Sequence, residues 1–274
     1  MDLLTRRHVL IGGVVALGAL ARAQIVGAQA APTTAGPADP KLVEDLVAAN
    51  RILVDQGVVD GYGHVSVRHD RAADRFLISR STAPELVTAA DIMEYDLDSV
   101  PVDPRGRATF LEIFIHGEIY RARPDVRAVV HNHSPSVIPF GVTGQPLRPL
   151  YHMSAFLGGG VPIFDIRQAS GGATDMLVRN AALGQALART LGARPVALMR
   201  GHGAVVVAEA LPEAVFRSVY TEVNARLQGQ AMALGGTVTY LDPEEARKAE
   251  VSVRGTIGRP WELWKRKALA AGSK

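Results

Sequence analysis

Two histidines, His131 and His133, are separated by one residue at the end of an apolar run. The run covers residues 126–133 and is rich in valine, which is typical of a buried β-strand. Because residues i and i+2 of a strand point to the same face, both imidazoles are expected to leave the sheet together. Two imidazoles on one face suit a tetrahedral or octahedral metal ion. A structural pair of buried histidines fits the same spacing, so this motif alone leaves both interpretations open.

A carboxylate and another histidine, Glu112 and His116, are four residues apart in a segment with helical periodicity. This spacing places both side chains on one face of a helix. Leu111 and Ile113 flank the glutamate, and burial raises the pKa of a carboxylic acid toward neutrality. The pattern predicts an acid–base residue. A Glu–His contact that only stabilises the helix fits it as well.

A third candidate, His202, lies between Gly201 and Gly203, directly after the apolar run 196–199. Glycines on both sides of a histidine indicate a place where the backbone approaches another group closely. The position is compatible with an ordinary turn. It is equally compatible with a third metal ligand.

These candidates must be positioned by intermixed strands and helices. Helices are predicted for residues 40–56, 109–121, 174–191 and 211–234, and strands for 64–68, 75–79, 92–97, 126–133, 161–164, 196–199 and 204–207. The order does not follow strict βαβ alternation. We therefore expect one α/β domain with helices outside a central sheet.

The composition restricts the kinds of site that the chain can build. Apolar residues make up 47% of the 274 residues and charged residues 21%, which is ordinary for a globular protein. Cysteine is absent, so a transition metal must be bound by histidines and carboxylates. The net charge is only +3 and aromatic residues make up 5%. These values do not favour nucleic-acid binding.

The N-terminal 30 residues have the layout of an export signal. Arg6 and Arg7 precede an uncharged stretch over residues 9–21, and a small-x-small cleavage site follows at residues 28–30. The stretch is too short to span a bilayer, and the paired arginines resemble a twin-arginine signal. We expect residues 1–30 to be a signal peptide recognised by the twin-arginine translocase, and the mature protein to be periplasmic or secreted, without a stable membrane span. An uncleaved N-terminal anchor is the alternative.

The rest of the chain is expected to form a single domain. Residues 31–40 contain three prolines and a glycine and are interpreted as a linker. Residues 41–237 carry all the motifs above. Residues 238–274 are expected to be a helical extension packed on the same domain, with Trp261 and Trp264 as its packing anchor.

Taken in order, the motifs resemble the class II aldolase/adducin superfamily. The resemblance rests on Glu112-x3-His116, Pro124-Asp125-Val126, Val129-Val130-His131-Asn132-His133 and Gly201-His202-Gly203, and on the glycine-rich segment Gly61-Tyr62-Gly63-His64-Val65-Ser66-Val67-Arg68. It covers about residues 41–237. The superfamily includes metal-dependent sugar-phosphate aldolases, ribulose-phosphate 4-epimerases and related decarboxylases.

The resemblance implies a fold, an assembly and a ligand set. The fold is a three-layer α/β/α sandwich around a mostly antiparallel sheet, and the usual assembly is a C4 homotetramer with active sites between subunits. His131, His133 and His202 are implied to bind one divalent metal per subunit. Zinc is expected first, although manganese, cobalt and iron also suit three imidazoles. Glu112 is implied to be the catalytic acid or base and His116 a supporting catalytic residue, with no further cofactor.

The chain departs from the phosphosugar pattern at several positions. Phe110 and Leu111 stand where those aldolases have small hydroxyl residues, and apolar side chains donate no hydrogen bonds. His64 replaces an asparagine, and residues 79–84 replace the phosphate loop. A planar guanidinium suits a carboxylate. The residues predicted to bind a carboxylate substrate are therefore Arg80, His64, Ser79, Ser81 and the loop residue His152.

These departures favour one reaction within the family. A metal ion beside an acid–base residue stabilises the enolate left when a carbon–carbon bond breaks. We expect a divalent-metal-dependent carbon–carbon lyase that decarboxylates a hydroxylated aromatic or heteroaromatic carboxylate. The alternatives are an aldolase or epimerase acting on a non-phosphorylated hydroxy-carbonyl compound, a non-haem iron oxygenase, and a non-catalytic adducin-like binding module.

Overall fold

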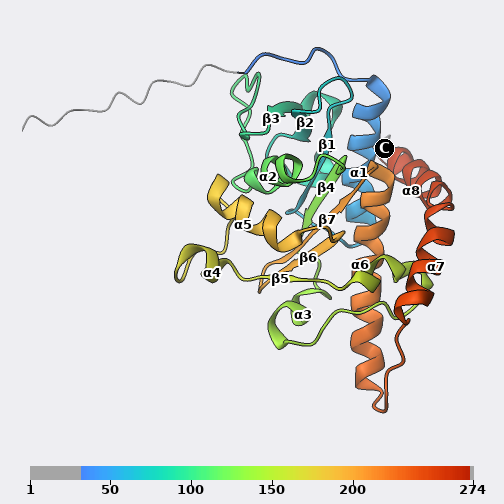
Figure 1. Cartoon of the computed structure of the whole chain (residues 1–274). Helices are drawn as coiled ribbons and strands as arrows, with labels where there is room; N and C mark the ends of the chain where they lie inside the picture. The colour runs from blue at the N-terminus through green and yellow to red at the C-terminus, as the bar shows by residue number, and fades with distance from the viewer. Residues whose placement is uncertain (1–31, 272–274) are drawn as a thin grey trace, which may run out of the picture. The chain divides into compact units, whose positions relative to one another are not determined.

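A seven-stranded sheet forms the centre of the domain in the computed structural model, which describes residues 32–271 (Figure 1). The strands are β1 (His64–Arg68), β2 (Arg75–Ser79), β3 (Ile92–Asp96), β4 (Ala128–Asn132), β5 (Ile163–Phe164), β6 (Val196–Met199) and β7 (Gly203–Ala208). Their order is β3-β2-β1-β4-β7-β6-β5, and only the β5–β6 pair is parallel. The predicted α/β fold with a mostly antiparallel sheet is confirmed.

Helices cover both faces of the sheet (Figure 1). One face carries α1 (Pro40–Asp55), α6 (Leu211–Ala233) and α8 (Gly258–Ala271), and the other carries α2 (Phe114–Ala122) and α5 (Ala181–Leu191). The remaining helices are α3 (Ile138–Thr143), α4 (Ile166–Ser170) and α7 (Pro243–Arg254), with a 3₁₀ segment at His152–Gly159. Strand residues alternate between the two cores: Val65 and Val67 face α1 and α6, whereas Val129 faces α2 and α5.

The register of the central strands gathers the histidines at one end of the sheet. His64 on β1 lies opposite His131 on β4. Strand β4 also pairs with β7, and its last residue, Asn132, lies opposite Ala204. His133 directly follows β4 and His202 directly precedes β7. Strand pairing therefore brings together residues that are up to 138 positions apart in the chain.

Two predicted helices begin later than expected. The helix predicted at 109–121 begins at Phe114, so Glu112 lies in a turn before α2 and does not share a regular helix with His116. The helix predicted at 174–191 begins at Ala181, because the Asn180 side chain caps it by accepting a hydrogen bond from the Leu183 N–H. Residues 174–180 instead form an irregular segment that reaches the histidine cluster.

The segment predicted as a linker contacts the domain. The Thr34 hydroxyl and the Ala35 N–H both donate hydrogen bonds to the carboxylate of Glu94 on β3. His69 Nε2 donates to the carbonyl of Gly36. At the other end of the chain, Trp264 is buried with its ring 6.3 Å from that of Tyr220 on α6.

Residues 1–30 lie outside the described residues, so the export signal, the translocase and the periplasmic or secreted location stay predictions from sequence. The predicted homotetramer also stays a prediction. Within residues 32–271, no helix combines the length and apolar character needed to cross a membrane.

Candidate functional site

Three imidazoles and one carboxylate meet at this end of the sheet. The residues are Glu112, His131, His133 and His202, and one ligand atom from each lies within 4.8 Å of the others. The Nε2 atoms of His131 and His133 are 3.2 Å apart, and those of His133 and His202 are 3.0 Å apart. Glu112 Oε2 lies 3.4 Å from Nε2 of both His131 and His202. The structure thus brings together the predicted metal ligands and the predicted acid–base residue.

The protonation pattern of these rings fits a cation. His131 Nδ1 lies 3.2 Å from the Ala204 carbonyl and His202 Nδ1 lies 3.0 Å from the Met176 carbonyl. A carbonyl only accepts hydrogen bonds, so both rings carry a proton on Nδ1, and Nε2 is the atom that can offer a lone pair to a cation. Lone pairs directed at one point repel each other unless a positive ion lies between them. Backbone carbonyls commonly orient metal-binding histidines in this way.

Glu112 is ionised in this environment. Burial alone would raise its pKa, but His131 and His202 hold the pKa of the carboxyl well below its usual range. The net direction is opposite to the sequence-based expectation, because positive charge at these two rings, carried by a proton on Nε2 when no cation is bound, outweighs burial. The second oxygen, Oε1, accepts a hydrogen bond from the Val178 N–H at 2.9 Å. Burial, with help from the neighbouring histidines, lowers the pKa of His133 to about 4 and keeps its ring neutral.

The two glycines beside His202 are needed for different structural reasons. Gly201 adopts a left-handed conformation with φ of 62°. Gly203 lies where β7 meets the end of β4, and a Cβ atom there would overlap the backbone carbonyl of Asn132. Close backbone approach therefore positions His202 beside the two histidines of β4.

Gly203→Ala is expected to lower the stability of the fold by about 3 kcal/mol or more, because the overlapping atoms belong to backbone that cannot move aside. The same variant should bind less metal, since His202 shifts relative to His131. Thermal unfolding and elemental analysis measure both effects. Gly229→Ala is the matched control, because Gly229 lies in α6 with no atom within 4 Å of the added methyl group. Equal melting temperatures for the two variants would contradict this account.

A cavity of about 330 Å³ opens beside the cluster. Its walls are formed by residues from five short segments: Gly61, Tyr62, Gly63, His64, Ser81, Thr82, Ala83, Phe110, Leu111, Glu112, His131, His133 and Leu177. Most of the accessible surface of this cavity is apolar. The Phe110 ring lies 4.5 Å from the ring of His64. His131, His133 and Glu112 are therefore within reach of one small molecule in this cavity.

The predicted substrate-binding residues are only partly brought to this cavity. His64 and Ser81 line it. The guanidinium of Arg80 instead pairs with Asp91 at 2.5 Å, so its carboxylate partner belongs to the chain itself. Ser79 is buried in β2, and the exposed His152 begins the 3₁₀ segment on the α6 and α7 side. Arg80, Ser79 and His152 are therefore not among the described residues that line this cavity, and their role in substrate binding stays a prediction.

His116 also lies away from the cavity surface, completely buried behind His64. His64 Nδ1 and His116 Nε2 are 2.7 Å apart, and His116 Nδ1 lies 2.6 Å from the Ser66 hydroxyl. That hydroxyl is 2.8 Å from the hydroxyl of Tyr120. Burial lowers the pKa of His116 to about 3. His116 can therefore reach the cavity only through His64, and its catalytic role stays a prediction.

Sequence reasoning missed several members of the site. Ser66 is two residues from His64 on a strand, and Tyr120 is four residues from His116 on a helix, so the spacing rules that predicted the cluster would have found both. The Met176 carbonyl and the Val178 N–H carry no signal in the sequence, because every residue has these groups.

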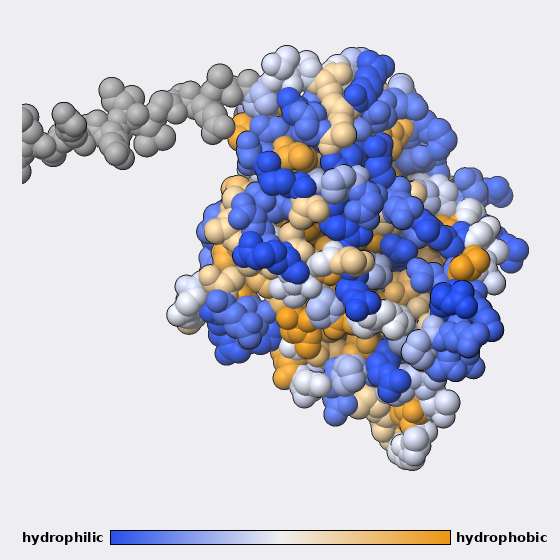
Figure 2. Space-filling view, viewed as in Figure 1, coloured by the Kyte–Doolittle hydropathy of each residue, from blue (hydrophilic) through white to orange (hydrophobic). Residues whose placement is uncertain are grey.

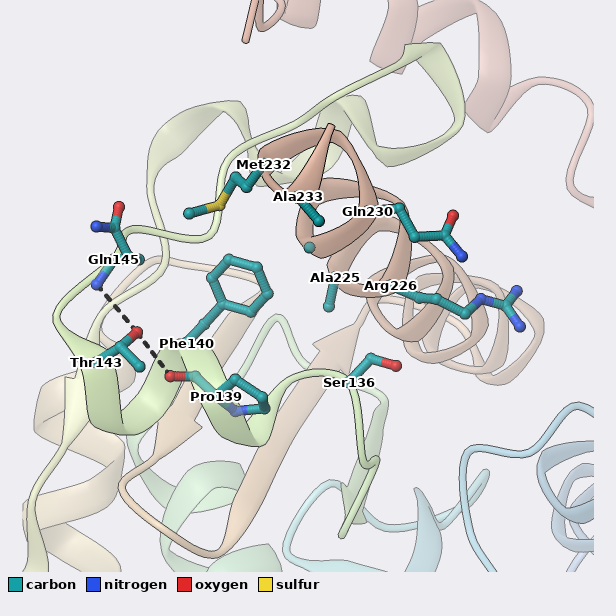
Figure 3. A pocket seen from close by; sticks show the side chains of 11 residues that line it. Ser136, Pro139, Phe140, Thr143, Gln145, Ala225, Arg226, Gln230, Met232 and Ala233 are labelled. Carbon is teal, nitrogen blue, oxygen red and sulfur yellow. Dashed lines mark hydrogen bonds between the residues drawn. The ribbon is translucent and has the colours of Figure 1, made fainter. Parts of the chain in front are cut away.

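A second cavity, of about 490 Å³, lies between α3 and the last turns of α6 (Figure 3). Phe140 and Pro139 face Ala225, Met232 and Ala233 across it. Figure 2 shows apolar surface gathered around the place where Figure 1 draws α3. Arg226 is the one charged residue in its lining, so this cavity offers no cluster of groups for metal binding or acid–base chemistry.

Comparisons with known proteins agree with the geometry. The family model "Class II Aldolase and Adducin N-terminal domain" matches residues 44–229. The chain is 37% identical to "Decarboxylase tropJ" of Talaromyces stipitatus, over 84% of this chain and 95% of that one. It is 32% identical to "3,4-dihydroxyphthalate decarboxylase" of Arthrobacter keyseri, over 72% and 82%. The fold is similar to L-fuculose 1-phosphate aldolase from Glaciozyma antarctica PI12, with a TM-score of 0.70, 22% identity and coverage of 85% and 90%.

Proposed function

Because the chain belongs to the class II aldolase and adducin family, we propose that it is a divalent-metal-dependent decarboxylase of hydroxylated aromatic or heteroaromatic carboxylates. Two relatives whose length it nearly spans are named as decarboxylases, one of them for a dihydroxylated aromatic diacid. The observation that carries the proposal is the apolar cavity directly beside Glu112 and the three histidines.

The lining of this cavity suits an aromatic ring better than a phosphosugar. Phe110, Leu111 and Leu177 offer apolar contact area, and most of the accessible surface of the cavity is apolar although several polar side chains contribute to it. Among the described residues that line it, none is an arginine or lysine, so a phosphate dianion has no cationic side chain of this chain to pair with. A planar ring gains most of its binding energy from such apolar walls.

The ligand set fits a divalent ion, with zinc expected first, held by His131, His133 and His202. When bound, it supplies positive charge that stabilises the negative charge developing on a ring oxygen. Glu112, as a carboxylate, accepts the proton of the ring hydroxyl. The bond between ring and carboxylate then breaks, carbon dioxide leaves without the bonding electrons, and Glu112 returns the proton to the ring carbon.

The test is an assay of the protein supplied with Zn²⁺ or Mn²⁺ on a panel of hydroxylated benzoates, phthalates and pyridine carboxylates. We expect carbon dioxide and the corresponding phenol in equal amounts, and no reaction after chelation of the metal. Oxygen uptake with iron would instead favour the oxygenase. Aldehyde release from hydroxy-carbonyl compounds, with every aromatic acid unchanged, would favour the aldolase.

A further inference from the structure

The hydrogen-bonded chain behind the cavity ends at one exposed ring nitrogen. From inside to outside it consists of the hydroxyl of Tyr120, the hydroxyl of Ser66, the ring of His116 and the ring of His64. All four side chains lie between α2 and β1 and are at least 96% buried. His64 lines the cavity, and its Nε2 atom has no hydrogen-bond partner within residues 32–271.

Tyr120, at the inner end of this hydrogen-bonded row, sets the donor and acceptor of every hydrogen bond in the row. The Tyr120 hydroxyl is buried, and its one hydrogen-bond partner among the described side chains is Ser66. Burial raises the pKa of Tyr120 far above its usual range, so the phenol keeps its proton. A buried O–H without an acceptor is costly. Tyr120 therefore donates to Ser66.

The remaining bonds follow from this first one. The Ser66 oxygen accepts from Tyr120, so its own hydrogen goes to Nδ1 of His116. His116, which is neutral, then carries its proton on Nε2 and donates to Nδ1 of His64. His64 in turn carries its proton on Nε2, the atom that faces the cavity. In the reverse arrangement the Tyr120 hydrogen has no acceptor among the described residues.

We propose that Tyr120, Ser66 and His116 fix His64 as a hydrogen-bond donor that recognises the carboxylate of the substrate, an inference that rests on the proposed function. The His64 ring lies 5.0 Å from the ring of His131. A substrate with a hydroxyl and a carboxylate on neighbouring ring carbons can therefore place the hydroxyl at the metal ligands and the carboxylate at His64. His64 contacts substrate in this arrangement, and the other three are positioning residues.

The binding test compares two probes that differ only in the carboxylate, 2,3-dihydroxybenzoate and catechol. Calorimetry is done on the Zn²⁺-loaded protein with Glu112→Gln to prevent turnover. Adding His64→Met should weaken binding of the acid about tenfold or more, since a hydrogen bond to a charged group is lost. Binding of catechol should not change, and His64→Gln, which keeps an N–H donor, should restore much of the affinity. Equal losses for both probes, or no loss for the acid, would overturn the proposal.

The direction of the chain is tested by nitrogen NMR of sedimented, ¹⁵N-histidine-labelled protein. The His64 signals, identified by their loss in His64→Gln, should show the proton on Nε2. Ser66→Asp and Ser66→Asn form a matched pair of nearly equal size. A carboxylate accepts from both neighbours and should move the His64 proton to Nδ1, whereas the amide can still donate to His116 and should leave it on Nε2.

Acid binding should be about tenfold weaker in Ser66→Asp than in Ser66→Asn, with catechol unaffected. A proton on Nδ1 of His64 in the unsubstituted protein would refute the inference, whether or not either variant folds. The outcome of these binding and NMR experiments does not depend on whether the protein releases carbon dioxide from its substrate. Binding and spectra as expected, with no carbon dioxide from any acid, would leave His64 as a carboxylate donor and remove the decarboxylase.

Discussion

Glu112→Gln is expected to lower kcat for decarboxylation roughly 100- to 10,000-fold, which is the usual contribution of a positioned acid–base group. Glutamine has nearly the same shape, and its carbonyl can still accept the hydrogen bond from the Val178 N–H. It cannot take up and return a proton. Metal content should be unchanged, because the three imidazoles remain. Carbon dioxide release and elemental analysis of the same samples separate the two effects.

The matched control for this variant is Glu118→Gln. Glu118 is equally buried, but it lies on α2 against Gly184 of α5 and 3.6 Å from Arg121, outside the cavity lining. The same chemical change there should leave kcat within about twofold, since it touches none of the reacting groups. Substantial turnover in Glu112→Gln would remove Glu112 from the mechanism. A large loss in both variants would point to a general effect of removing buried charge.

Much of the sheet could be predicted from the sequence, because its strands are short and bounded by polar turns. Strands β1, β2 and β6 begin and end at the predicted residues, since alternation or a β-branched run is a strong local signal. The helices α2 and α5 were less predictable at their first residues. Apolar periodicity continues upstream of both helices. The hydrogen bond from the Val178 N–H to Glu112 and the capping residue Asn180 fix the backbone before α5, whereas residues 111–113 form a turn before α2.

The candidate site shows the same division between local and non-local information. His131 and His133 were predictable as a pair because a strand aligns them, and the family resemblance added His202. Arg80 was predicted to bind substrate, but its guanidinium pairs with Asp91, eleven positions away in the short 3₁₀ helix Ala89–Asp91, whose position the sequence does not reveal. Charged residues near a site satisfy each other whenever the fold allows it, and only coordinates show which ones do so.

Ser66 and Tyr120 illustrate a different reason for failure. Serine and tyrosine are common in cores, and neither residue type by itself indicates chemistry. Their importance comes from burial, since a buried hydroxyl must find a partner and so imposes a direction on its neighbours. Sequence periodicity predicts which face these side chains occupy, but the direction of a hydrogen-bonded chain follows only once all its partners are known.

His131→Ala is expected to remove the metal itself. The wild-type protein should carry about one divalent ion per chain, and the variant close to none. Loss of a residue that only hydrogen-bonds to a ligand already lowers metal affinity roughly 10- to 100-fold, and loss of a ligand itself should lower it further. His131 is completely buried, and the Ala204 carbonyl orients its Nδ1, so Nε2 faces the other predicted ligands. Turnover should fall with the metal content, in contrast to Glu112→Gln, which keeps the metal.

His69→Gln is the control for this experiment. His69 is equally buried, but its ring nitrogens bond to the Gly36 carbonyl and the Arg71 N–H and not to the cluster. It should keep the full metal content. An unchanged metal content in His131→Ala would show that the ion is bound elsewhere, and the proposed mechanism would lose its basis.

Zinc, manganese or cobalt in the wild-type protein supports the lyase, since each polarises an oxygen without redox chemistry in this site. Iron redirects the search to oxygen consumption, because an open ferrous site with three imidazoles can also activate dioxygen.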